Sequence, residues 1–152
     1  MSDWTPIRGP IPPLFFLIAL FVEIGLGLLP GATFIAPPWH LAGLAFIAFG
    51  LSLAVWGRLE FQRAGTSVHP GEQPTALVAK GPFRFTRNPM YLGMTLVLLG
   101  VAMLFGKLIP LLMPFVFAWV ISVRFIRHEE TRLVDLFGDA YADYMHRVRR
   151  WL

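Results

Sequence analysis

The sequence predicts an all-α fold: a polytopic membrane protein with about four transmembrane helices, the last two forming a helical hairpin, followed by an amphipathic C-terminal helical segment. Three observations lead to this prediction. Hydrophobic residues make up 56 % of the 152 residues, and the mean hydropathy is +0.62. Charged residues make up only 14 %, whereas a typical soluble domain carries about 25 %. The apolar residues are gathered into four long runs, as in membrane spans. The length suits a single domain.

The first two predicted spans are the apolar runs 14–29 and 40–56, joined by a short connector without Lys or Arg. No small-residue cleavage site follows the first run, so we expect a retained span rather than a signal peptide. Glu23 interrupts this run, and an ionisable group inside a span usually faces other helices. We favour a neutral Glu23 bonded to a backbone carbonyl over a functional acid.

The third and fourth predicted spans are the runs 89–105 and 108–126, separated by a tight turn at Gly106 and Lys107. The short turn predicts a helical hairpin. At 1.5 Å per residue the third run would be about 26 Å long, slightly short of a hydrocarbon core of about 30 Å. Two prolines are expected to bend the second arm of the hairpin: Pro110 and Pro114. Small residues are expected to let helices approach closely at Gly27, Gly31, Gly93 and Gly100.

The tail, residues 128–152, has the pattern of two amphipathic helices. Apolar residues recur there at spacings of three or four positions: Leu133, Phe137, Tyr141, Tyr144 and Val148. Gly138 is expected to close the first helix, and Asp139 is expected to cap the second. Four residues at the end of the tail are expected to contact lipid head groups: Arg147, Arg149, Arg150 and Trp151.

The basic residues are distributed unevenly among the connectors. With four spans, Arg8, five basic residues of the loop 57–88 and six beyond position 123 fall on one side, and only Lys107 of the 13 falls on the other. The positive-inside rule then places both termini and the loop 58–88 in the cytoplasm. We expect a multi-pass protein of a bacterial inner membrane, in which the loop and the tail share one face and together build one site.

The most informative stretch begins at Gly81 and enters the third run at Pro89. Asn88 is expected to be the N-cap of this helix, with Pro89 at the first helical position. The free N–H groups of the helix would then face Arg84 and Arg87, an arrangement that suits an anion such as a carboxylate. Aromatic residues would supply apolar walls: Phe83, Phe85 and Tyr91. A helix cap with a membrane-anchoring arginine is the alternative, but it does not explain why these side chains concentrate in one turn.

Glu129 and Glu130 directly follow the fourth run. The helix dipole disfavours acids just past the C-terminal end of a membrane helix, so we expect a cation beside them. Arg84, Arg87 and a cationic ligand are the candidates, and simple solvation of a helix end is the alternative.

Several classes of site are excluded or disfavoured. The chain has no cysteine, which excludes disulfides, thiolate zinc sites and cysteine nucleophiles. His40 and His69 have no partner at metal-ligand spacing, so no metal site is expected. His128 is expected at the surface.

Four of these sequence features occur together in one family. The run 75–78, the stretch 81–93 with Arg-Asn-Pro-x-Tyr, the pair Glu129-Glu130 and the pattern Leu-x3-Phe-Gly-x2-Tyr-x2-Tyr at 133–144 resemble the isoprenylcysteine carboxyl methyltransferase family. The related phospholipid methyltransferases share part of this pattern. The resemblance covers roughly residues 60–152. The pairing of the two motifs around a helical hairpin is fairly specific, whereas either motif alone would be weak.

The resemblance implies a membrane methyltransferase that uses S-adenosylmethionine and releases S-adenosylhomocysteine. Residues 1–57 would form two N-terminal spans, and residues 58–152 would bind the cofactor and carry out catalysis. Together with the charge pattern, the resemblance implies twelve cofactor-binding residues: Thr75, Ala76, Leu77, Val78, Phe83, Arg87, Asn88, Pro89, Met90, Tyr91, Glu129 and Glu130. Two residues would take part in catalysis: Glu129, and Arg124, which lies near the position of an arginine that faces the acceptor in this family.

Two features depart from the family pattern. Asn88 stands where many relatives have His, and Asn can cap a helix and hydrogen-bond but cannot act as a base. The chain is also shorter than the eukaryotic enzymes. The acceptor is therefore open: a carboxylate such as that of an isoprenylcysteine, a thiol, an amine or a phospholipid head group.

Membrane lipids and a lipophilic small-molecule acceptor are the expected partners, no nucleic-acid partner is expected, and the oligomeric state is open. Two other hypotheses compete with the enzyme. One is a non-catalytic membrane module that binds anionic lipid or a protein partner, and the other is a small transporter that uses Glu23. The enzyme hypothesis requires the loop 58–88 to fold against the acids that follow the fourth span.

Overall fold

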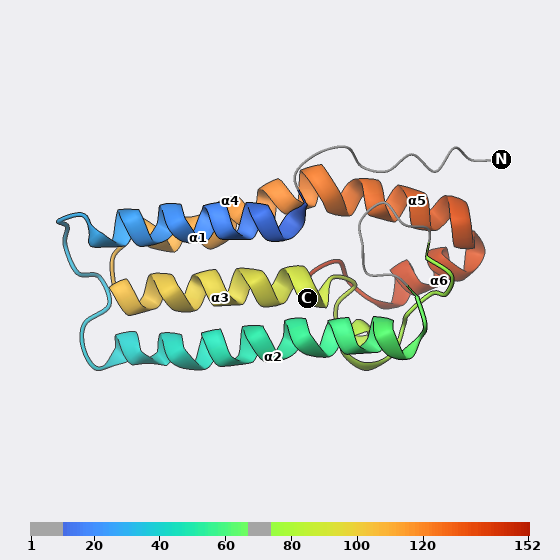
Figure 1. The fold of residues 1–152 in the computed structure, drawn as a ribbon, viewed down its shortest axis with the longest axis horizontal. Coiled ribbons are helices and arrows are strands. Elements are labelled where there is room, and N and C mark those ends of the chain that lie inside the picture. Colours follow the sequence, from blue (N-terminus) through green and yellow to red (C-terminus); the bar gives the residue numbers. More distant parts are fainter. Residues whose placement is uncertain (1–10, 67–73) are drawn as a thin grey trace.

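The computed structural model describes residues 11–66 and 74–152. Within these residues the chain is helical, with one isolated antiparallel bridge between Thr33 and Lys107 and no named strand. Four helical segments run along one axis, and two further helices extend the bundle at one end (Figure 1). The expectations for Arg8 and His69 lie outside the described residues.

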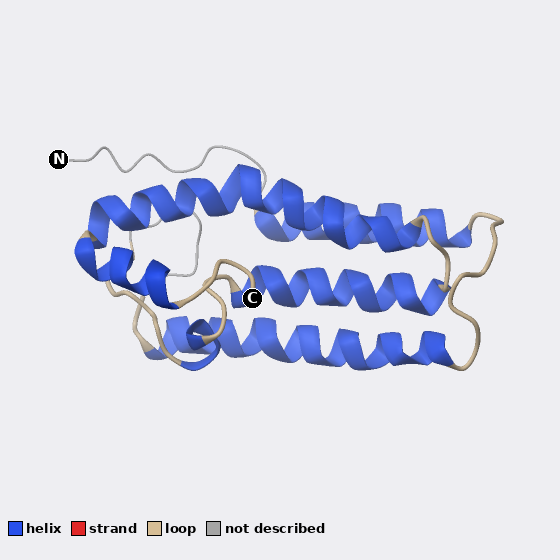
Figure 2. Cartoon of the chain, turned by 180° about the vertical axis from the view of Figure 1, so that it is seen from behind, coloured by secondary structure: helices blue, strands red, loops and turns tan. Residues whose placement is uncertain are grey.

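The helices follow the apolar runs of the sequence closely. Their bounds are Pro12–Leu28 (α1), Ala42–Arg63 (α2), Pro89–Phe105 (α3), Met113–Ile121 (α4), Arg127–Phe137 (α5) and Asp139–Arg147 (α6). Short 3-10 turns occur at Trp39–Leu41, Gly81–Arg84 and Pro110–Leu112, and a π-helical turn, Ser122–Ile126, joins α4 to α5. The predicted hairpin of α3 and α4 is confirmed, and Gly106 ends α3 in the left-handed conformation at φ 66°. Loops gather at the two ends of the bundle (Figure 2).

α3 is the central helix, and α2 packs along its whole length because glycines face each other across the contact. A Cβ on Gly43 would collide with the carbonyl of Gly100, and one on Gly50 would collide with the carbonyl of Gly93. The glycines on each helix are seven residues apart, so they lie on one stripe of the helix surface. The close approach predicted at Gly93 and Gly100 is therefore confirmed.

α1 and α4 pack against α3 on the side away from α2. This contact forms one apolar core, whose buried members are Ala19, Tyr91, Leu98, Phe117, Ile121, Phe125 and Ile126. Edge-to-face aromatic pairs join α1 to α4 and to the π-helical turn that follows it. The centroid distances are 5.3 Å for Phe15 and Phe125 and 6.1 Å for Phe16 and Phe117. Gly27 lets α1 approach α3 closely, as expected, because a Cβ there would overlap the ring of Phe105. Gly31 lies beyond the end of α1.

Two predicted helix ends are wrong. α2 continues to Arg63 instead of ending at position 56, since its last turns contain good helix formers and an ion pair of 2.7 Å between Glu60 and Arg63. The helical stretch that begins at Pro110 continues through α4 and the π-helical turn into α5. The acids at 129 and 130 therefore lie on the first predicted tail helix, but no helix end precedes them.

The prolines of the fourth segment do not bend it in its interior. Pro110 lies in the first positions of a 3-10 turn, and Pro114 lies in the first turn of α4. A proline in a first turn costs little because its missing N–H would have no partner there.

Glu23 is fully buried on the face of α1 that meets the bundle. Both of its carboxylate oxygens lack a hydrogen-bond partner among the described residues. The expected bond to a backbone carbonyl is therefore wrong for the described residues, because the carbonyls of a continuous helix accept hydrogen bonds within it.

Lys107 stabilises the end of the bundle opposite α5 and α6. Its ammonium donates hydrogen bonds of 2.6 Å to the carbonyls of Gly27 and Leu29, which end α1. The N–H groups of Phe34 and Ile35 bind the carbonyl of Gly106 in the same turn. The other basic residues of the described chain lie on or beside the elements at the opposite end.

Two helical stretches are long and apolar enough to cross a membrane, Trp39–Arg63 and Pro110–Phe137. α1 and α3 are apolar but have only 17 residues each. α1, α2 and α4 carry large apolar side chains on their outer faces, among them Phe21, Phe49, Phe115 and Trp119. These helices therefore suit a membrane.

Candidate functional site

The end of the bundle that carries α5 and α6 is called the head here, and comprises residues 74–88, α5, α6 and residues 148–152. Its core is a second apolar cluster with the buried residues Val78, Phe83, Tyr141, Tyr144 and Val148. Leu133 and Phe137 pack against this cluster, so the amphipathic pattern predicted for the tail is confirmed. The loop before α3 is thereby packed onto the last two helices.

Gly138 closes α5 with φ 53°, as predicted. Asp139 does not cap α6, because Gly138 occupies the N-cap position and Asp139 lies in the first turn. A carboxylate in a first turn still interacts favourably with the helix dipole.

Phe83 and Phe85 have opposite environments. Phe83 is 5 % exposed, meets the ring of Phe61 edge to face at 5.2 Å, and its carbonyl accepts a 2.7 Å hydrogen bond from the hydroxyl of Tyr144. Phe85 is 69 % exposed. The expectation that Phe85 forms an apolar wall of the site is therefore wrong. The 3-10 turn at Gly81–Arg84 directs the two rings differently.

Tyr91 brings the start of α3 to the acids on α5. Its hydroxyl donates a 2.8 Å hydrogen bond to Oε1 of Glu129. Burial raises the pKa of Glu129, while the bond from Tyr91 and the charge of Arg132 act in the opposite direction. Glu129 is thus a partly buried acid with one oxygen held by a phenol.

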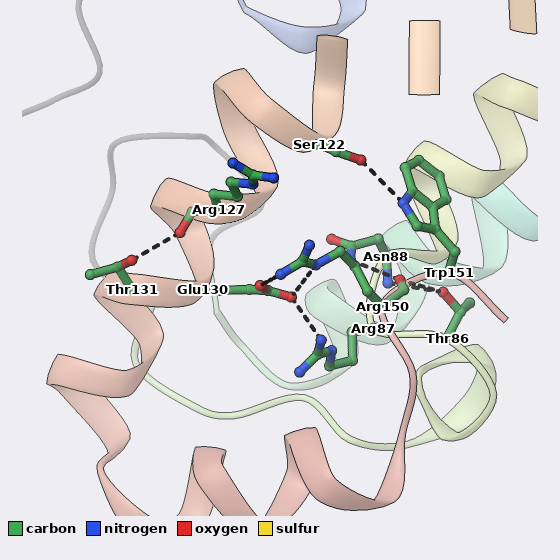
Figure 3. A network of polar contacts seen from close by, with 9 residues as sticks. All are labelled: Thr86, Arg87, Asn88, Ser122, Arg127, Glu130, Thr131, Arg150 and Trp151. Atoms are coloured by element: carbon green, nitrogen blue, oxygen red, sulfur yellow. Dashed lines mark hydrogen bonds and ion pairs between the residues drawn. The ribbon is translucent and has the colours of Figure 1, made fainter. Parts of the chain in front are cut away.

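Glu130 lies between two arginines (Figure 3). Its Oε1 is 3.0 Å from a guanidinium nitrogen of Arg87 and accepts a 3.0 Å hydrogen bond from Nε of Arg150. Its Oε2 binds a second nitrogen of Arg150. The expectation that Arg87 lies beside the acids is confirmed. Arg84 is exposed and forms no ion pair with another described residue.

The chain end folds back onto the turn before α3. We call residues Val148–Trp151 the strap. The N–H of Arg87 donates to the carbonyl of Arg149 at 3.0 Å, and the side chains of Thr86 and Asn88 donate to the carbonyl of Arg150 at 3.2 and 3.0 Å. Trp151 donates through its indole to the hydroxyl of Ser122 at 3.2 Å.

The strap changes the roles expected for three residues. Asn88 occupies the N-cap position of α3, but its side chain makes no capping bond because it binds the strap. Arg150 and Trp151 were expected at lipid head groups and instead fold inward onto Glu130 and the core of the bundle. Arg147 and Arg149 are exposed, and their contact with lipid head groups stays a prediction.

The remaining predicted site residues are spread around the head. The backbone N–H of Thr75 donates a 2.9 Å hydrogen bond to the hydroxyl of Thr66. Val78 is buried, and Ala76 and Leu77 are partly buried. Pro89 and Met90 pack close to Gly57 of α2. Arg124 lies in the π-helical turn and is exposed. The structure thus brings Arg87, Asn88, Tyr91, Glu129 and Glu130 together, and does not bring Arg124 into a contact with them.

Sequence reasoning did not assign Thr86, Tyr141 or Arg150 to this site. Burial raises the pKa of Tyr141 to about 12, and the charge of nearby Glu130 adds to the rise while Arg87 opposes it. Tyr141 therefore lies close to the charged cluster. Its helical spacing indicated burial, but nothing in its neighbourhood in the sequence indicated these charges. No group of metal-binding side chains occurs among the described residues.

Two curated proteins are similar to this chain. A protein-S-isoprenylcysteine O-methyltransferase of Schizosaccharomyces pombe is 26 % identical over 127 residues, which cover 76 % of this chain and 50 % of that relative. An uncharacterized protein of Haemophilus influenzae is 41 % identical over 63 residues, 41 % of this chain and 100 % of that relative. The chain spans about half the length of the S. pombe relative.

The phospholipid methyltransferase family matches residues 38–140, which is more than half of the chain. The matched part includes α2, the turn before α3, the hairpin and both acids of α5. The resemblance recognised in the sequence is therefore confirmed: the chain is similar to an isoprenylcysteine O-methyltransferase, and it belongs to the phospholipid methyltransferase family.

Proposed function

We propose that this protein is an S-adenosylmethionine-dependent methyltransferase, embedded in a membrane, that methylates a lipophilic acceptor. The observation that carries the proposal is the contact between the two halves of the family motif. Tyr91 binds Glu129 and Arg87 pairs with Glu130, so the turn before α3 and the acids of α5 form one site at the end of an apolar bundle.

The side chains of this site fit S-adenosylmethionine, which carries an ammonium, a sulfonium, a carboxylate and ribose hydroxyls. Glu129 has one oxygen held by Tyr91 and a second that is not used in any hydrogen bond within the described chain, which suits a cation or a hydroxyl. Nε of Arg87 is buried and lacks an acceptor among the described residues, which suits a carboxylate. Tyr91 and Tyr141 are buried in the two apolar cores beside these charges.

The cofactor supplies an activated methyl group, and the chain contributes alignment and exclusion of water. Holding two reactants in line can lower a barrier by roughly 7–11 kcal/mol, so no metal is required. Glu129 is the better candidate for a proton acceptor, because both oxygens of Glu130 are engaged by arginines. A carboxylate or thiolate acceptor would not need this base, whereas an amine would.

We further propose four membrane spans, α1, α2, α3 and the segment from Pro110 to the π-helical turn. The support is the apolar outer surface of the bundle and the position of Lys107 at the end opposite the head. The positive-inside rule then places the head and both termini in the cytoplasm of a bacterial cell. Arg124 is exposed near the end of the fourth span, where it could meet the polar group of an acceptor that enters from the bilayer.

The acceptor is proposed to be an amphiphile with its reactive group at the interface. The S. pombe relative is named for an isoprenylcysteine, and the matching family is named for phospholipids. Both acceptor classes place a polar group beside long apolar chains, which fits a polar head on an apolar bundle.

The proposal is tested with purified protein in detergent and in lipid bilayers. Binding of S-adenosylhomocysteine is measured by calorimetry, and transfer is measured with isotopically labelled methyl donor and a membrane lipid extract, followed by identification of the labelled product. Glu129→Gln and Arg87→Ala are expected to weaken binding, and Arg84→Ala is the matched control because Arg84 is exposed. Undiminished binding in both site variants would reject this site.

A non-catalytic module that binds anionic lipid predicts a different result. Its binding would be strongly salt-dependent and indifferent to S-adenosylmethionine. The same purified protein, titrated with vesicles that contain anionic lipid, separates the two hypotheses.

A further inference from the structure

We infer that the strap, Val148–Trp151, is a latch that holds the cofactor-binding turn in its working geometry, and that Arg150 is its positioning residue. Arg150 would act on methyl transfer through Glu130 and Arg87 rather than by contact with the reacting atoms. The inference rests on the proposed function, and it assigns different tasks to the two adjacent acids of α5.

The backbone of the strap holds the turn before α3 at consecutive residues. Thr86, Arg87 and Asn88 all donate to strap carbonyls, two of them to the same carbonyl of Arg150. Thr86 is 1 % exposed, and its hydroxyl also accepts the N–H of Asn88 at 3.2 Å. The polar groups of the turn that carries the family motif therefore bind a segment more than 60 residues away in the sequence.

The side chains of the strap hold α5 and the π-helical turn. Arg150 binds both oxygens of Glu130, and Trp151 donates to Ser122 while its ring packs against the core that contains Tyr91. One short segment therefore joins the three elements that meet at the site. Figure 3 shows these contacts converging from the turn, α5 and the chain end.

Glu129 and Glu130 are separated in function by these contacts. Arg150 and Arg87 together engage both oxygens of Glu130, so this acid has little capacity to bind a ligand. Glu129 keeps one oxygen outside the bond from Tyr91. We therefore assign Glu129 to the ligand and Glu130 to the latch, which revises the cofactor contact expected for Glu130.

Arg87 would transmit the state of the latch. Its backbone binds the strap, one guanidinium nitrogen binds Glu130, and its Nε is buried without an acceptor among the described residues. Loss of the bidentate Arg150 contact would leave Glu130 with Arg87 alone, and Arg87 would then be drawn further toward the acid. Its Nε would lose the position that suits the ligand carboxylate.

The test compares Arg150→Met with Arg150→Lys and with the control Arg147→Met. Arg147 lies at the end of α6, is exposed and bonds only to a carbonyl one turn back among the described residues, so its variant makes the same charge change without breaking the latch. For Arg150→Met we expect the Kd for S-adenosylhomocysteine and the KM for S-adenosylmethionine to rise about tenfold, because a charge-assisted contact is lost. Arg150→Lys should recover part of the loss, since an ammonium keeps the charge but not the two-pronged geometry.

A second measurement does not depend on the cofactor. Hydrogen exchange of the Arg87 amide, which binds the carbonyl of Arg149, should be faster in Arg150→Met than in Arg147→Met. A wild-type protein that binds and transfers, with Arg150→Met unchanged in Kd, KM and exchange, would overturn the latch alone. A wild-type protein without cofactor binding would overturn both the proposed function and the positioning role. A fall in melting temperature and kcat at constant KM would also contradict positioning, because it would indicate a structural role only.

Discussion

The hydroxyl of Tyr91 on α3 donates a 2.8 Å hydrogen bond to Glu129 on α5, across 38 positions of the sequence. The hairpin of α3 and the fourth segment makes this contact possible, because it returns the chain to the end of the bundle from which α3 started. The phenol and the carboxylate then lie at the boundary between the apolar core and the polar head. This bond links the two motifs that identify the family.

Tyr91→Phe should separate the contribution of this bond from that of the aromatic ring. A hydrogen bond to a charged group contributes about 1.5–3 kcal/mol, so the variant should lose stability and bind S-adenosylhomocysteine more weakly while keeping its packing. Thermal unfolding in detergent and calorimetric binding measure the two effects. Tyr91→Phe with wild-type affinity would show that the phenol does not orient Glu129 for the ligand.

The pH dependence of stability should reveal the burial of Glu129. Burial raises the pKa of this acid in the folded protein above its usual value near 4.5. The folded state then holds the proton more tightly than the unfolded state, so stability is lost as the pH rises from about 4.5 through the folded pKa.

Glu129→Gln cannot titrate and is the matched control for this effect. The difference in melting temperature, wild type minus Glu129→Gln, should therefore decrease as the pH rises above 4.5. Affinity for a cationic ligand should change in the opposite sense and increase with pH, because the carboxylate form binds it. A difference in melting temperature that stays constant over this range would contradict the raised pKa.

The glycine stripe between α2 and α3 should tolerate no side chain. At Gly100 an added Cβ would overlap the carbonyl of Gly43 and the side chain of Ile47. Gly100→Val is expected to destabilise the protein by at least about 1–3 kcal/mol, because backbone atoms cannot move aside as a flexible side chain can.

Gly25→Ala is the control for this prediction, since nothing lies within 4 Å of a Cβ at that position of α1. It should be neutral or stabilising by about 0.5–1 kcal/mol through helix propensity. Thermal unfolding in the same detergent compares the two. Equal melting temperatures would show that α2 and α3 do not meet through this stripe.

Local sequence signals predicted the helices but not the contacts of the chain end. Pro89 and Gly106 mark the two ends of α3, because proline is favoured at the first helical position and glycine just after the last. The spacing of Tyr141 and Tyr144 indicates a buried helix face. Arg150 looked like an ordinary interfacial arginine, since neither its neighbours nor its spacing indicates a partner 20 positions earlier.

The role of Asn88 was missed for a related physical reason. An Asn before Pro at a helix start is a typical cap by residue type. Its amide instead binds a carbonyl of the strap, 62 positions away, and that competition depends on tertiary structure alone. The same holds for α2. The polar residues of its last turns predict a loop, but these turns are helical and Phe61 packs there against the head.

Glu23 offers the test that separates an enzyme from a transporter. Its side chain is fully buried, and neither oxygen has a hydrogen-bond partner among the described residues. An acid left without partners costs free energy, so an apolar residue of similar size at this position should be neutral or stabilising by about 1–3 kcal/mol. We expect Glu23→Leu to raise the melting temperature and to leave the transfer of labelled methyl groups close to wild type, because position 23 lies on α1 between Ala19 and Gly27, away from the head. Glu23→Gln, which keeps the shape but not the charge, should likewise remain active. Loss of methyl transfer in both variants, with the folded state intact, would make Glu23 a functional acid of the methyltransferase. The transporter hypothesis instead predicts a wild type without methyl transfer, in which Glu23→Gln abolishes transport and substitutions in the loop 58–88 are tolerated.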